Sequence, residues 1–360
     1  MRGAVMYGPG DVRVEDRDEP RIVKATDAII RLPATCICGS DLWPYRGLEA
    51  ADWPVPMGHE YVGIVEEVGS EVRTIKPGQF VIGSFFASDN TCEICQAGYQ
   101  SSCIHREPIG AEGAQAELAR VPLADGTLVA TPDVPPDELI PSFLAASDVL
   151  GTGWFGAVAA EAGPGKTVAV VGDGAVGLLA VLAASQLGAE RIIAMSRHQP
   201  RQKLAVEFGA TDVVTERGDA GVAKVKEPTN GLGAHSVVEA VGTQESMLQA
   251  IGSTRPGGHV GYVGVAHGGA ARHRAVLLPR APARRARAGA PVPAAAGRPD
   301  LEPTDRPRQG LRPHPPAGAG RRGLPRHGRT PRHQDPAAAL DANSRSSPQR
   351  STRNRSISQA

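Results

Sequence analysis

Short apolar runs recur through the first part of the chain, and glycine, proline, serine and aspartate separate them. Runs of this length, bounded by turn residues, are typical of strands in an antiparallel arrangement. Residues 1–149 are therefore predicted to form a β-rich domain. The predicted strands are residues 27–32, 61–68, 79–85 and 116–121.

From residue 150 the pattern changes, because strand-length apolar runs alternate with longer helical segments. This alternation predicts βαβ units with right-handed crossovers and a parallel sheet in a second, α/β domain over residues 150–267. The predicted strands are residues 167–171, 191–195, 236–240 and 259–263. The predicted helices are residues 175–187, 201–208 and 244–251, and Gly188 and Gly209 end the first two.

The last part of the chain has a different composition. Residues 266–360 contain 19 arginines, 14 prolines, five acidic residues and no aromatic residue, which gives a net charge of +14. Residues 1–265 contain 33 acidic and 20 basic residues, a net charge of −13. A segment with so little apolar surface cannot form a core, so residues 268–360 are predicted to be a disordered tail.

The sequence pattern predicts neither a membrane-spanning protein nor a secreted one. No apolar run is long enough for a transmembrane helix, and the N-terminus lacks the apolar region of a signal peptide. The five cysteines, an odd number, then indicate reduced thiols or metal ligands in a cytoplasmic protein. They are Cys36, Cys38, Cys92, Cys95 and Cys103.

The run at 168–171 leads into a G-x-G-x-x-G motif formed by Gly172, Gly174 and Gly177, with Ala175 and Val176 between the last two. The first glycine permits a tight turn, the second lets the backbone approach a pyrophosphate, and the third lets the helix pack close to the strand. Phosphates bind at such a helix N-terminus. A glycine-rich turn without a ligand is the alternative, but the strand and helix on either side favour dinucleotide binding.

Residues with metal-binding side chains occur at three separate places in the chain. They are Cys38, His59 beside Glu60, and Asp148. A thiolate, an imidazole and a carboxylate are suitable ligands for zinc, and three protein ligands leave a fourth position open for water or substrate. Taken singly, each residue is more often a buried thiol or a surface hydrogen-bonding group.

Together these features resemble the zinc-dependent alcohol dehydrogenases of the medium-chain dehydrogenase/reductase superfamily. The resemblance covers residues 1 to about 267 and implies a GroES-like catalytic domain, a Rossmann domain, and an active site in the cleft between them. The matching segments are Cys38-Gly39-Ser40-Asp41, Gly58-His59-Glu60 with Gly63, Gly69, Val72, Gly78, residues 148–153, and residues 172–177.

The resemblance also implies roles for residues around the metal. Cys38, His59 and Asp148 would be the ligands of a catalytic zinc. Glu60 would lie beside the metal as a neighbouring residue or a transient ligand. Asp41 would hold the free ring nitrogen of His59, as zinc-bound imidazoles require.

Other residues take their expected roles from the same resemblance. Zinc would polarise the alcohol, Ser40 would relay its proton, and the carbon would give hydride to a nicotinamide near Thr152. Val241 is assigned to the cofactor site as well. Family members often have histidine where this chain has Trp43 and Phe155, so the outer end of the proton relay stays open.

A second, structural zinc is expected on Asp89, Cys92, Cys95 and Cys103. Many family members have four cysteines here, and this chain matches the last three, with Asp89 at the first place. A carboxylate can ligate zinc and complete a four-coordinate shell. The alternative is a lobe kept for its shape alone.

The choice between NAD and NADP depends on the end of the second strand of the α/β domain. NAD-binding proteins place an acidic residue there, about 20 positions after the glycines. This chain has Ser196, which leaves no negative charge to repel a 2′-phosphate, and Arg197 and Arg201 are suited to clamp one. NADP is favoured over NAD, and the alternative is a solvated basic helix start.

The tail departs from the family, whose chains continue with further strands that build the usual dimer. Family chains often end with sequences such as GYRAMD and AIKTLL. When plausible codons for these two sequences are translated in the frame shifted by two nucleotides, they give LPRHG and HQDPAA, the sequences of residues 324–328 and 333–338. A frameshift near residues 266–270 is therefore predicted, and it leaves open both homo-oligomerisation and whether the product is active. A nucleotide sequence without an alternative family-like frame would contradict this.

The predicted function is a zinc-dependent oxidoreductase that converts an alcohol and NAD(P)+ into an aldehyde or ketone and NAD(P)H. Its expected partner is a small alcohol or aldehyde, with no specific nucleic acid and no membrane. Alternatives with the same fold are polyol, threonine or formaldehyde dehydrogenases, and zinc-free quinone reductases. An Arg-rich tail that binds phosphate backbones is a further alternative from a different class.

Overall fold

The computed structural model describes residues 1–107, 109 and 113–266. The predicted disordered tail, residues 268–360, lies outside the described residues. So does all but residue 266 of the segment in which the frameshift is predicted. The division into domains at residues 149 and 150 stays a prediction.

The first half of the described chain contains two antiparallel sheets, which confirms the predicted β-rich fold. One sheet has the order β7-β3-β5-β6-β8 and the other has the order β2-β1-β4. The strands are β1 Arg2–Gly8, β2 Asp11–Asp16, β3 Ala28–Cys36, β4 Val55–Pro56, β5 Glu60–Val68, β6 Phe80–Gly83, β7 Leu118–Val121 and β8 Leu128–Ala130.

The pairing of β3 with β5 decides where the metal ligands lie. These strands are antiparallel neighbours, and Cys36 at the end of β3 faces Glu60 at the start of β5. The residues just after β3 and just before β5 therefore come together. The pair is anchored by a core that includes Ile30, Tyr61 and Val65, all at most 2% exposed.

Short helices lie between or after the strands of the first half. These are η1 Gly39–Asp41, α1 Leu42–Tyr45, α2 Glu93–Gln96, η2 Gln100–Ser102, α3 Ala124–Thr127, η3 Asp137–Leu139 and α4 Ile140–Ala145. The following helix, α5 Val149–Ala159, leads into the second half.

The second half contains a five-stranded parallel sheet with the order β11-β10-β9-β12-β13, which confirms the predicted Rossmann-type fold. The strands are β9 Thr167–Val171, β10 Arg191–Met195, β11 Asp212–Val214, β12 Ala234–Glu239 and β13 Thr254–Tyr262. The helical segments are α6 Ala175–Gln186, α7 Gln199–Glu207, α8 Gly218–Lys226, η4 Glu227–Thr229 and α9 Gln244–Ser253.

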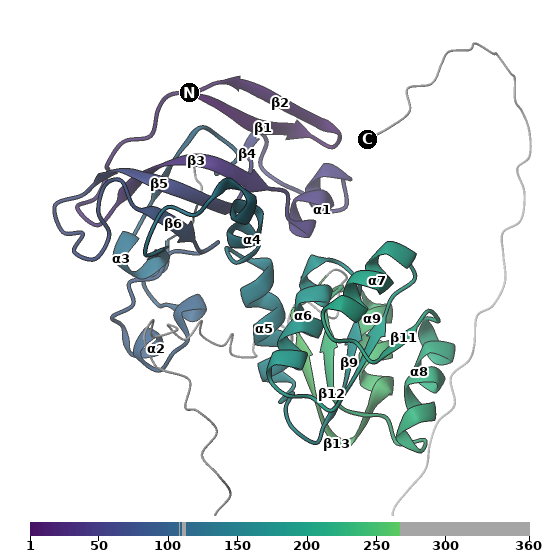
Figure 1. The fold of residues 1–360 in the computed structure, drawn as a ribbon. Helices are drawn as coiled ribbons and strands as arrows, with labels where there is room; N and C mark the ends of the chain where they lie inside the picture. The colour runs from purple at the N-terminus through teal and green to yellow at the C-terminus, as the bar shows by residue number, and fades with distance from the viewer. Residues whose placement is uncertain (108, 110–112, 267–360) are drawn as a thin grey trace, which may run out of the picture. The chain divides into compact units, whose positions relative to one another are not determined.

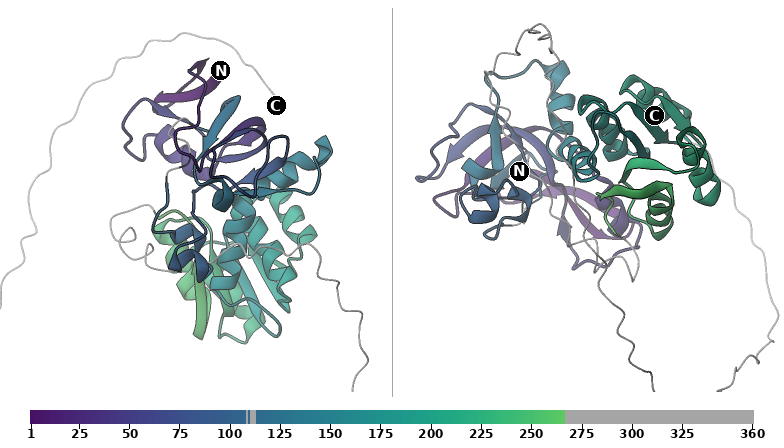
Figure 2. Two further views of the ribbon diagram at one scale, coloured as in Figure 1. Left: turned by 90° about the vertical axis from the view of Figure 1, so that its left-hand side faces the viewer. Right: turned by 90° about the horizontal axis from the view of Figure 1, so that it is seen from below.

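Helices cover both faces of this parallel sheet (Figures 1 and 2). Alternate strand residues point to opposite faces. Val168 and Val170 of β9 contribute to the core shared with α5, α6 and α7, whereas Ala169 and Val171 contribute to the core shared with α8 and α9. Burial on both faces explains why the strands read as continuous apolar runs.

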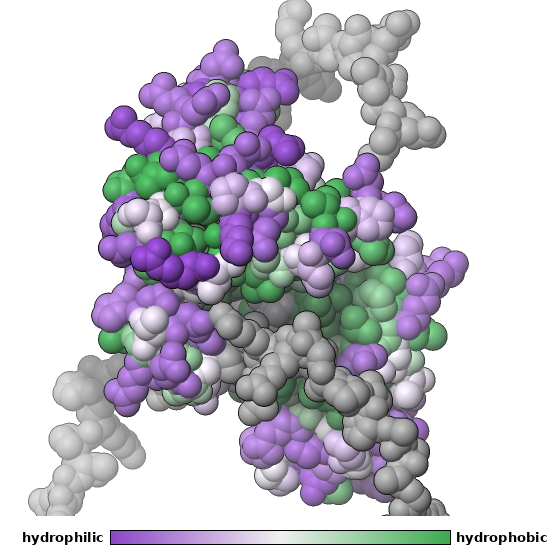
Figure 3. All heavy atoms as spheres, turned by 60° about the vertical axis from the view of Figure 1, so that its left-hand side comes forward, coloured by the Kyte–Doolittle hydropathy of each residue, from purple (hydrophilic) through white to green (hydrophobic). Residues whose placement is uncertain are grey.

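On the face drawn in Figure 3, green apolar patches of the described residues are broken by purple polar side chains. None of the described helices combines the length and the apolar character needed to cross a bilayer. The cytoplasmic location stays a prediction.

Candidate metal centres and nucleotide site

The structure brings Cys38, His59, Glu60 and Asp148 together, and we call this group the first cluster. Cys38 follows β3 and precedes η1, His59 precedes β5, and Asp148 occupies the N-cap position of α5. The antiparallel pairing of β3 with β5 places the first two side by side, and α5 supplies the carboxylate.

The distances in the first cluster suit a zinc ion. One ligand atom from each residue lies within 4.8 Å of the others. The Cys38 Sγ is 3.8 Å from Asp148 Oδ2, and the His59 Nε2 is 3.7 Å from the same oxygen. Tetrahedral zinc with ordinary bond lengths separates its ligand atoms by roughly 3.6 Å. The residues present therefore fit the metal.

The electrostatics of the first cluster also favour a cation. Burial raises the pKa of the Cys38 thiol to about 12, against hydrogen bonds from Ser40. Burial raises the pKa of Asp148 too, and the charge of Glu60 adds to that shift. A divalent cation stabilises the ionised thiolate and carboxylate that this buried site otherwise disfavours.

Glu60 shows the same need for a partner. Its side chain is buried, and Oε2 accepts a hydrogen bond from the Cys36 thiol at 2.7 Å. The other oxygen, Oε1, has no hydrogen-bond partner among the described residues. A buried carboxylate oxygen without a donor is costly, and a nearby cation would satisfy it.

The residues around the first cluster hold its members in place. Asp41 accepts a hydrogen bond from the Cys38 backbone at 2.9 Å, and its Oδ1 lies 3.6 Å from His59 Nδ1. This leaves Nε2 of His59 facing the cluster. Thr152 donates a hydrogen bond from its hydroxyl to Asp148 Oδ1 at 2.7 Å. The catalytic roles predicted for these residues stay predictions.

An aromatic residue that the sequence analysis missed lies beside the first cluster. The Phe85 ring meets the His59 ring edge to face, with centroids 6.4 Å apart. Phe86 lies against Phe85 at 4.5 Å. The wall of the site next to His59 is therefore apolar.

Asp89, Cys92, Cys95 and Cys103 form the second cluster, with ligand atoms again within 4.8 Å. The Sγ atoms of Cys92 and Cys103 are 3.9 Å apart, and Asp89 Oδ1 lies 3.3 Å from the Cys103 Sγ. All three thiols are buried. The Asp89 carboxylate thus lies beside the three thiols, and its role as the fourth zinc ligand stays a prediction.

Hydrogen bonds orient the Asp89 carboxylate in the second cluster. Oδ1 accepts from the backbone nitrogens of Thr91 at 3.0 Å and Cys92 at 3.2 Å, and Oδ2 lies 2.6 Å from His105 Nδ1. Burial opposes ionisation, but these partners together hold the pKa of Asp89 well below its usual range. An ionised, oriented carboxylate is suited to bind a metal.

The three fingerprint glycines have the geometry that the sequence analysis requires of them. Gly172 has φ of 117°, a conformation that side chains rarely adopt. A Cβ on Gly177 would lie 2.1 Å from the Gly172 carbonyl oxygen, so α6 approaches the turn closely. A Cβ on Gly174 would meet nothing within 4 Å, which leaves that backbone accessible. Binding of a cofactor here stays a prediction.

The end of β10 differs from expectation. Ser196 is expected to leave the site without negative charge. This is wrong, because the carboxylate of Asp173, between Gly172 and Gly174, extends from the end of β9 to Ser196 at the end of β10. The Asp173 Oδ2 accepts a hydrogen bond from Ser196 Oγ at 2.8 Å and from the Arg197 nitrogen at 3.3 Å. Its Oδ1 pairs with Arg201 at 3.2 Å.

Two further residues lie at this edge of the sheet. Arg217, which the sequence analysis missed, donates a hydrogen bond to the Met195 carbonyl at 3.1 Å. Burial lowers the pKa of Arg217, and the nearby charge of Arg197 lowers it further. Val241 follows β12, and its Cγ2 would contact a Cβ placed on Gly172. The structure thus brings Val241 beside the glycine turn.

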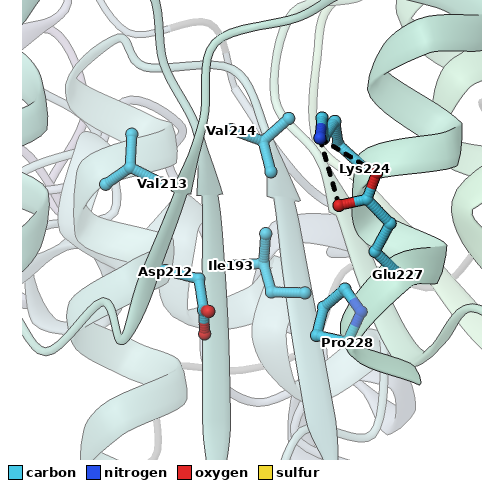
Figure 4. A pocket seen from close by; sticks show the side chains of 7 residues that line it. All are labelled: Ile193, Asp212, Val213, Val214, Lys224, Glu227 and Pro228. Atoms are coloured by element: carbon cyan, nitrogen blue, oxygen red, sulfur yellow. Dashed lines mark hydrogen bonds and ion pairs between the residues drawn. The ribbon is translucent and has the colours of Figure 1, made fainter. Parts of the chain in front are cut away.

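A separate cavity of about 300 Å³ lies along the β11 edge of the parallel sheet (Figure 4). Its lining includes Ile193, Asp212 and Val214, and a Lys224–Glu227 ion pair of 2.9 Å lies at one side. None of the predicted site residues lines this cavity, so it has no part in the predicted chemistry.

Two sequence families match the chain. The family described as alcohol dehydrogenase GroES-like domain matches residues 24–133, and the family described as zinc-binding dehydrogenase matches residues 175–284. The two matches correspond to the antiparallel and the parallel halves.

Several known proteins are similar to the chain. Medium chain reductase/dehydrogenase ucsI of Acremonium sp. is 36% identical over 74% of this chain and 94% of that protein. Zinc-type alcohol dehydrogenase B of Aspergillus flavus is 35% identical over 74% of this chain and 64% of that protein. NADP-dependent isopropanol dehydrogenase of Clostridium beijerinckii is 32% identical over 78% of this chain and 79% of that protein.

The fold is also similar to solved structures. Alcohol dehydrogenase TADH from Thermus sp. ATN1 superimposes with a TM-score of 0.67 and 35% identity, covering 74% of this chain and 78% of that chain.

Proposed function

Because this chain belongs to the zinc-binding medium-chain alcohol dehydrogenase family, we propose that it transfers hydride between an alcohol and NADP, and less readily NAD. The first cluster carries the proposal, since it joins a thiol, an imidazole and a carboxylate from three distant positions within 4.8 Å. Cys38, His59 and Asp148 would hold the zinc. Bound zinc would supply a Lewis acid, and the bound nicotinamide a hydride acceptor.

The chain's own residues orient the ligands and handle the proton. Asp41 keeps the His59 ring in the orientation that turns Nε2 toward the cluster. Thr152 fixes one oxygen of Asp148 by its hydrogen bond of 2.7 Å. Ser40 lies in η1, the short helix that follows Cys38. We assign it the transfer of the substrate's hydroxyl proton.

The surroundings of His59 support a small apolar alcohol as the substrate class. The Phe85 ring lies against the His59 ring in a T-shaped arrangement, and Phe86 extends the apolar wall. The name of the Clostridium beijerinckii relative indicates isopropanol, an alcohol of this kind. A secondary alcohol with short alkyl groups is the substrate we propose.

Basic residues at the end of β10 support the preference for NADP. Arg197, Arg201 and Arg217 converge there, and three guanidinium groups outnumber the single Asp173 carboxylate. The 2′-phosphate of NADP is a strong acceptor for such groups. The Clostridium beijerinckii relative is named as NADP-dependent.

The proposal is tested by measuring zinc content and 2-butanol oxidation with NADP+ in the full-length protein. His59→Ala should lose one of two zinc ions per chain and reduce turnover below detection. Asp41→Asn should keep both ions and lower kcat/KM by about 10- to 100-fold, because the His59 ring is no longer fixed.

Asp212→Asn is the control for these variants, since it removes a carboxylate that pairs with Arg191 away from both clusters. It should behave as the wild type. If His59→Ala kept both zinc ions and its turnover, the proposed site would be wrong.

A further inference from the structure

We propose that Asp173 selects between the two forms of the cofactor: its carboxylate accepts the ribose 2′-hydroxyl of NAD and opposes the 2′-phosphate of NADP. The inference rests on the proposed function, because it assumes that a dinucleotide binds at the glycine turn. It makes Asp173 a specificity-determining residue that keeps NAD usable in a site rich in arginine.

The position of Asp173 carries the first step. Asp173 follows β9, and β9 pairs with β10 so that Val171 faces Met195. The side chain of Asp173 therefore reaches Ser196, the residue after β10, at 2.8 Å. In Rossmann folds the carboxylate that binds the ribose 2′-hydroxyl lies at the end of this second strand. Here the carboxylate reaches the same place from the turn.

The hydrogen bonds of Asp173 carry the second step. The carboxylate accepts hydrogen bonds from the Ser196 hydroxyl, the Arg197 backbone nitrogen and one nitrogen of Arg201, at distances between 2.8 and 3.3 Å. A 2′-phosphate on this ribose would need the same three donors. Asp173 and the phosphate therefore compete for them, whereas a 2′-hydroxyl can donate to the carboxylate without displacing it.

The charge of Asp173 carries the third step. Burial opposes ionisation, but the hydrogen bonds from Ser196 and Arg201 outweigh it and lower the pKa of Asp173. The group is therefore negative at neutral pH. Two negative groups that share one set of donors repel each other, and a repulsion of about 1.4 kcal/mol is enough to change affinity tenfold.

The experiment compares two small nucleotides that differ only at the 2′ position. AMP and adenosine 2′,5′-bisphosphate are titrated into the full-length protein by calorimetry, and NADH and NADPH are compared by kcat/KM. Asp173→Asn keeps the shape and removes the charge, so it should raise the preference for the 2′-phosphate about tenfold or more. Asp212→Asn is the matched control, because it removes a carboxylate that pairs with Arg191 at another place in the fold. It should leave the preference unchanged.

A second variant protects the test against misfolding of the first. Arg201→Gln leaves Asp173 without its cation partner, so the preference for the 2′-phosphate should fall. Opposite shifts in the two variants support the inference. An unchanged or lower preference in Asp173→Asn would overturn it, because Asp173 would then only position Arg201.

The outcomes separate the inference from the proposed function. If the nucleotides bind with the expected shift but no alcohol is oxidised, the inference stands and the proposed reaction is wrong. If the wild type binds neither nucleotide, the dinucleotide site is wrong and the inference is overturned with it.

Discussion

Each glycine of the nucleotide turn is needed for a different reason. Gly172 requires a positive φ, Gly177 has no room for a methyl group beside the Gly172 carbonyl, and Gly174 has open space where a phosphate would lie. Only the first two requirements come from the fold itself. The third would come from the ligand alone, so substitution can separate folding from binding.

We expect Gly177→Ala to lower Tm by about 5 °C, because the added methyl group pushes α6 away from the turn. Gly174→Ala should leave Tm unchanged and weaken NADPH binding at least about tenfold, because its methyl group would displace a phosphate. Thermal unfolding and calorimetric titration measure the two effects. Unchanged NADPH affinity in Gly174→Ala would contradict a pyrophosphate at this turn.

At the same scale, the sequence located most of the candidate site, because its residue types and spacings are distinctive. Cys38, His59 and Asp148 were all predicted and lie together. Asp173 was missed although it lies inside the fingerprint. Its contact with Ser196 spans two strands, and such contacts are invisible to a pattern that is read along the chain.

At the scale of elements, prediction succeeded where a segment forms one continuous apolar run bounded by polar or glycine residues. The buried strands β9 and β10 were predicted with their bounds. Helix α5 was missed because Gly151, Gly153 and Gly156 lower its helix propensity. The β1–β2 hairpin was missed because β2 is largely exposed and has a weak apolar pattern. In both cases tertiary contacts decide the structure.

The lobe that contains α2 and η2 has almost no core of its own. Its buried cluster consists of three cysteines, against which Ile94 is packed. Four residues of α2 cannot form a stable helix alone. We therefore expect a metal bound by these thiols to stabilise the lobe.

We expect Asp89→Ala to reduce zinc from two ions per chain to one and to speed amide exchange across residues 89–106 at least about tenfold. Metal analysis and hydrogen-exchange mass spectrometry measure these effects. Glu93→Gln, which changes a neighbouring carboxylate outside the second cluster, is the control. Two retained zinc ions in Asp89→Ala would show that Asp89 is not a ligand, whereas a single zinc ion in the wild type would favour a lobe kept for its shape alone.

At the scale of the whole molecule, charge is divided along the chain. Residues 1–265 have a net charge of −13 and residues 266–360 a net charge of +14. A basic segment of this size binds polyanions without sequence preference and with strong salt dependence. The frameshift that would explain such a segment stays a prediction from the sequence.

We expect the full chain to bind a heparin column at low salt and to elute as salt rises, because released counterions drive this binding. A form that ends at residue 266 should pass through the column, since its net charge is negative. Identical elution of the two forms would show that the arginines of the tail do not act as a polyanion site.

The glycines of α5 have a consequence for how substrate range can change. A Cβ on Gly153 would lie 2.7 Å from the Ala180 nitrogen of α6, so the two helices meet backbone to backbone. Helix α5, whose N-cap residue is Asp148, would thus act as a spacer of fixed length between a metal at the first cluster and a cofactor at the glycine turn. Adaptation to a bulkier alcohol would then have to change side chains such as Phe85, because the close contact between α5 and α6 fixes the distance between the two sites.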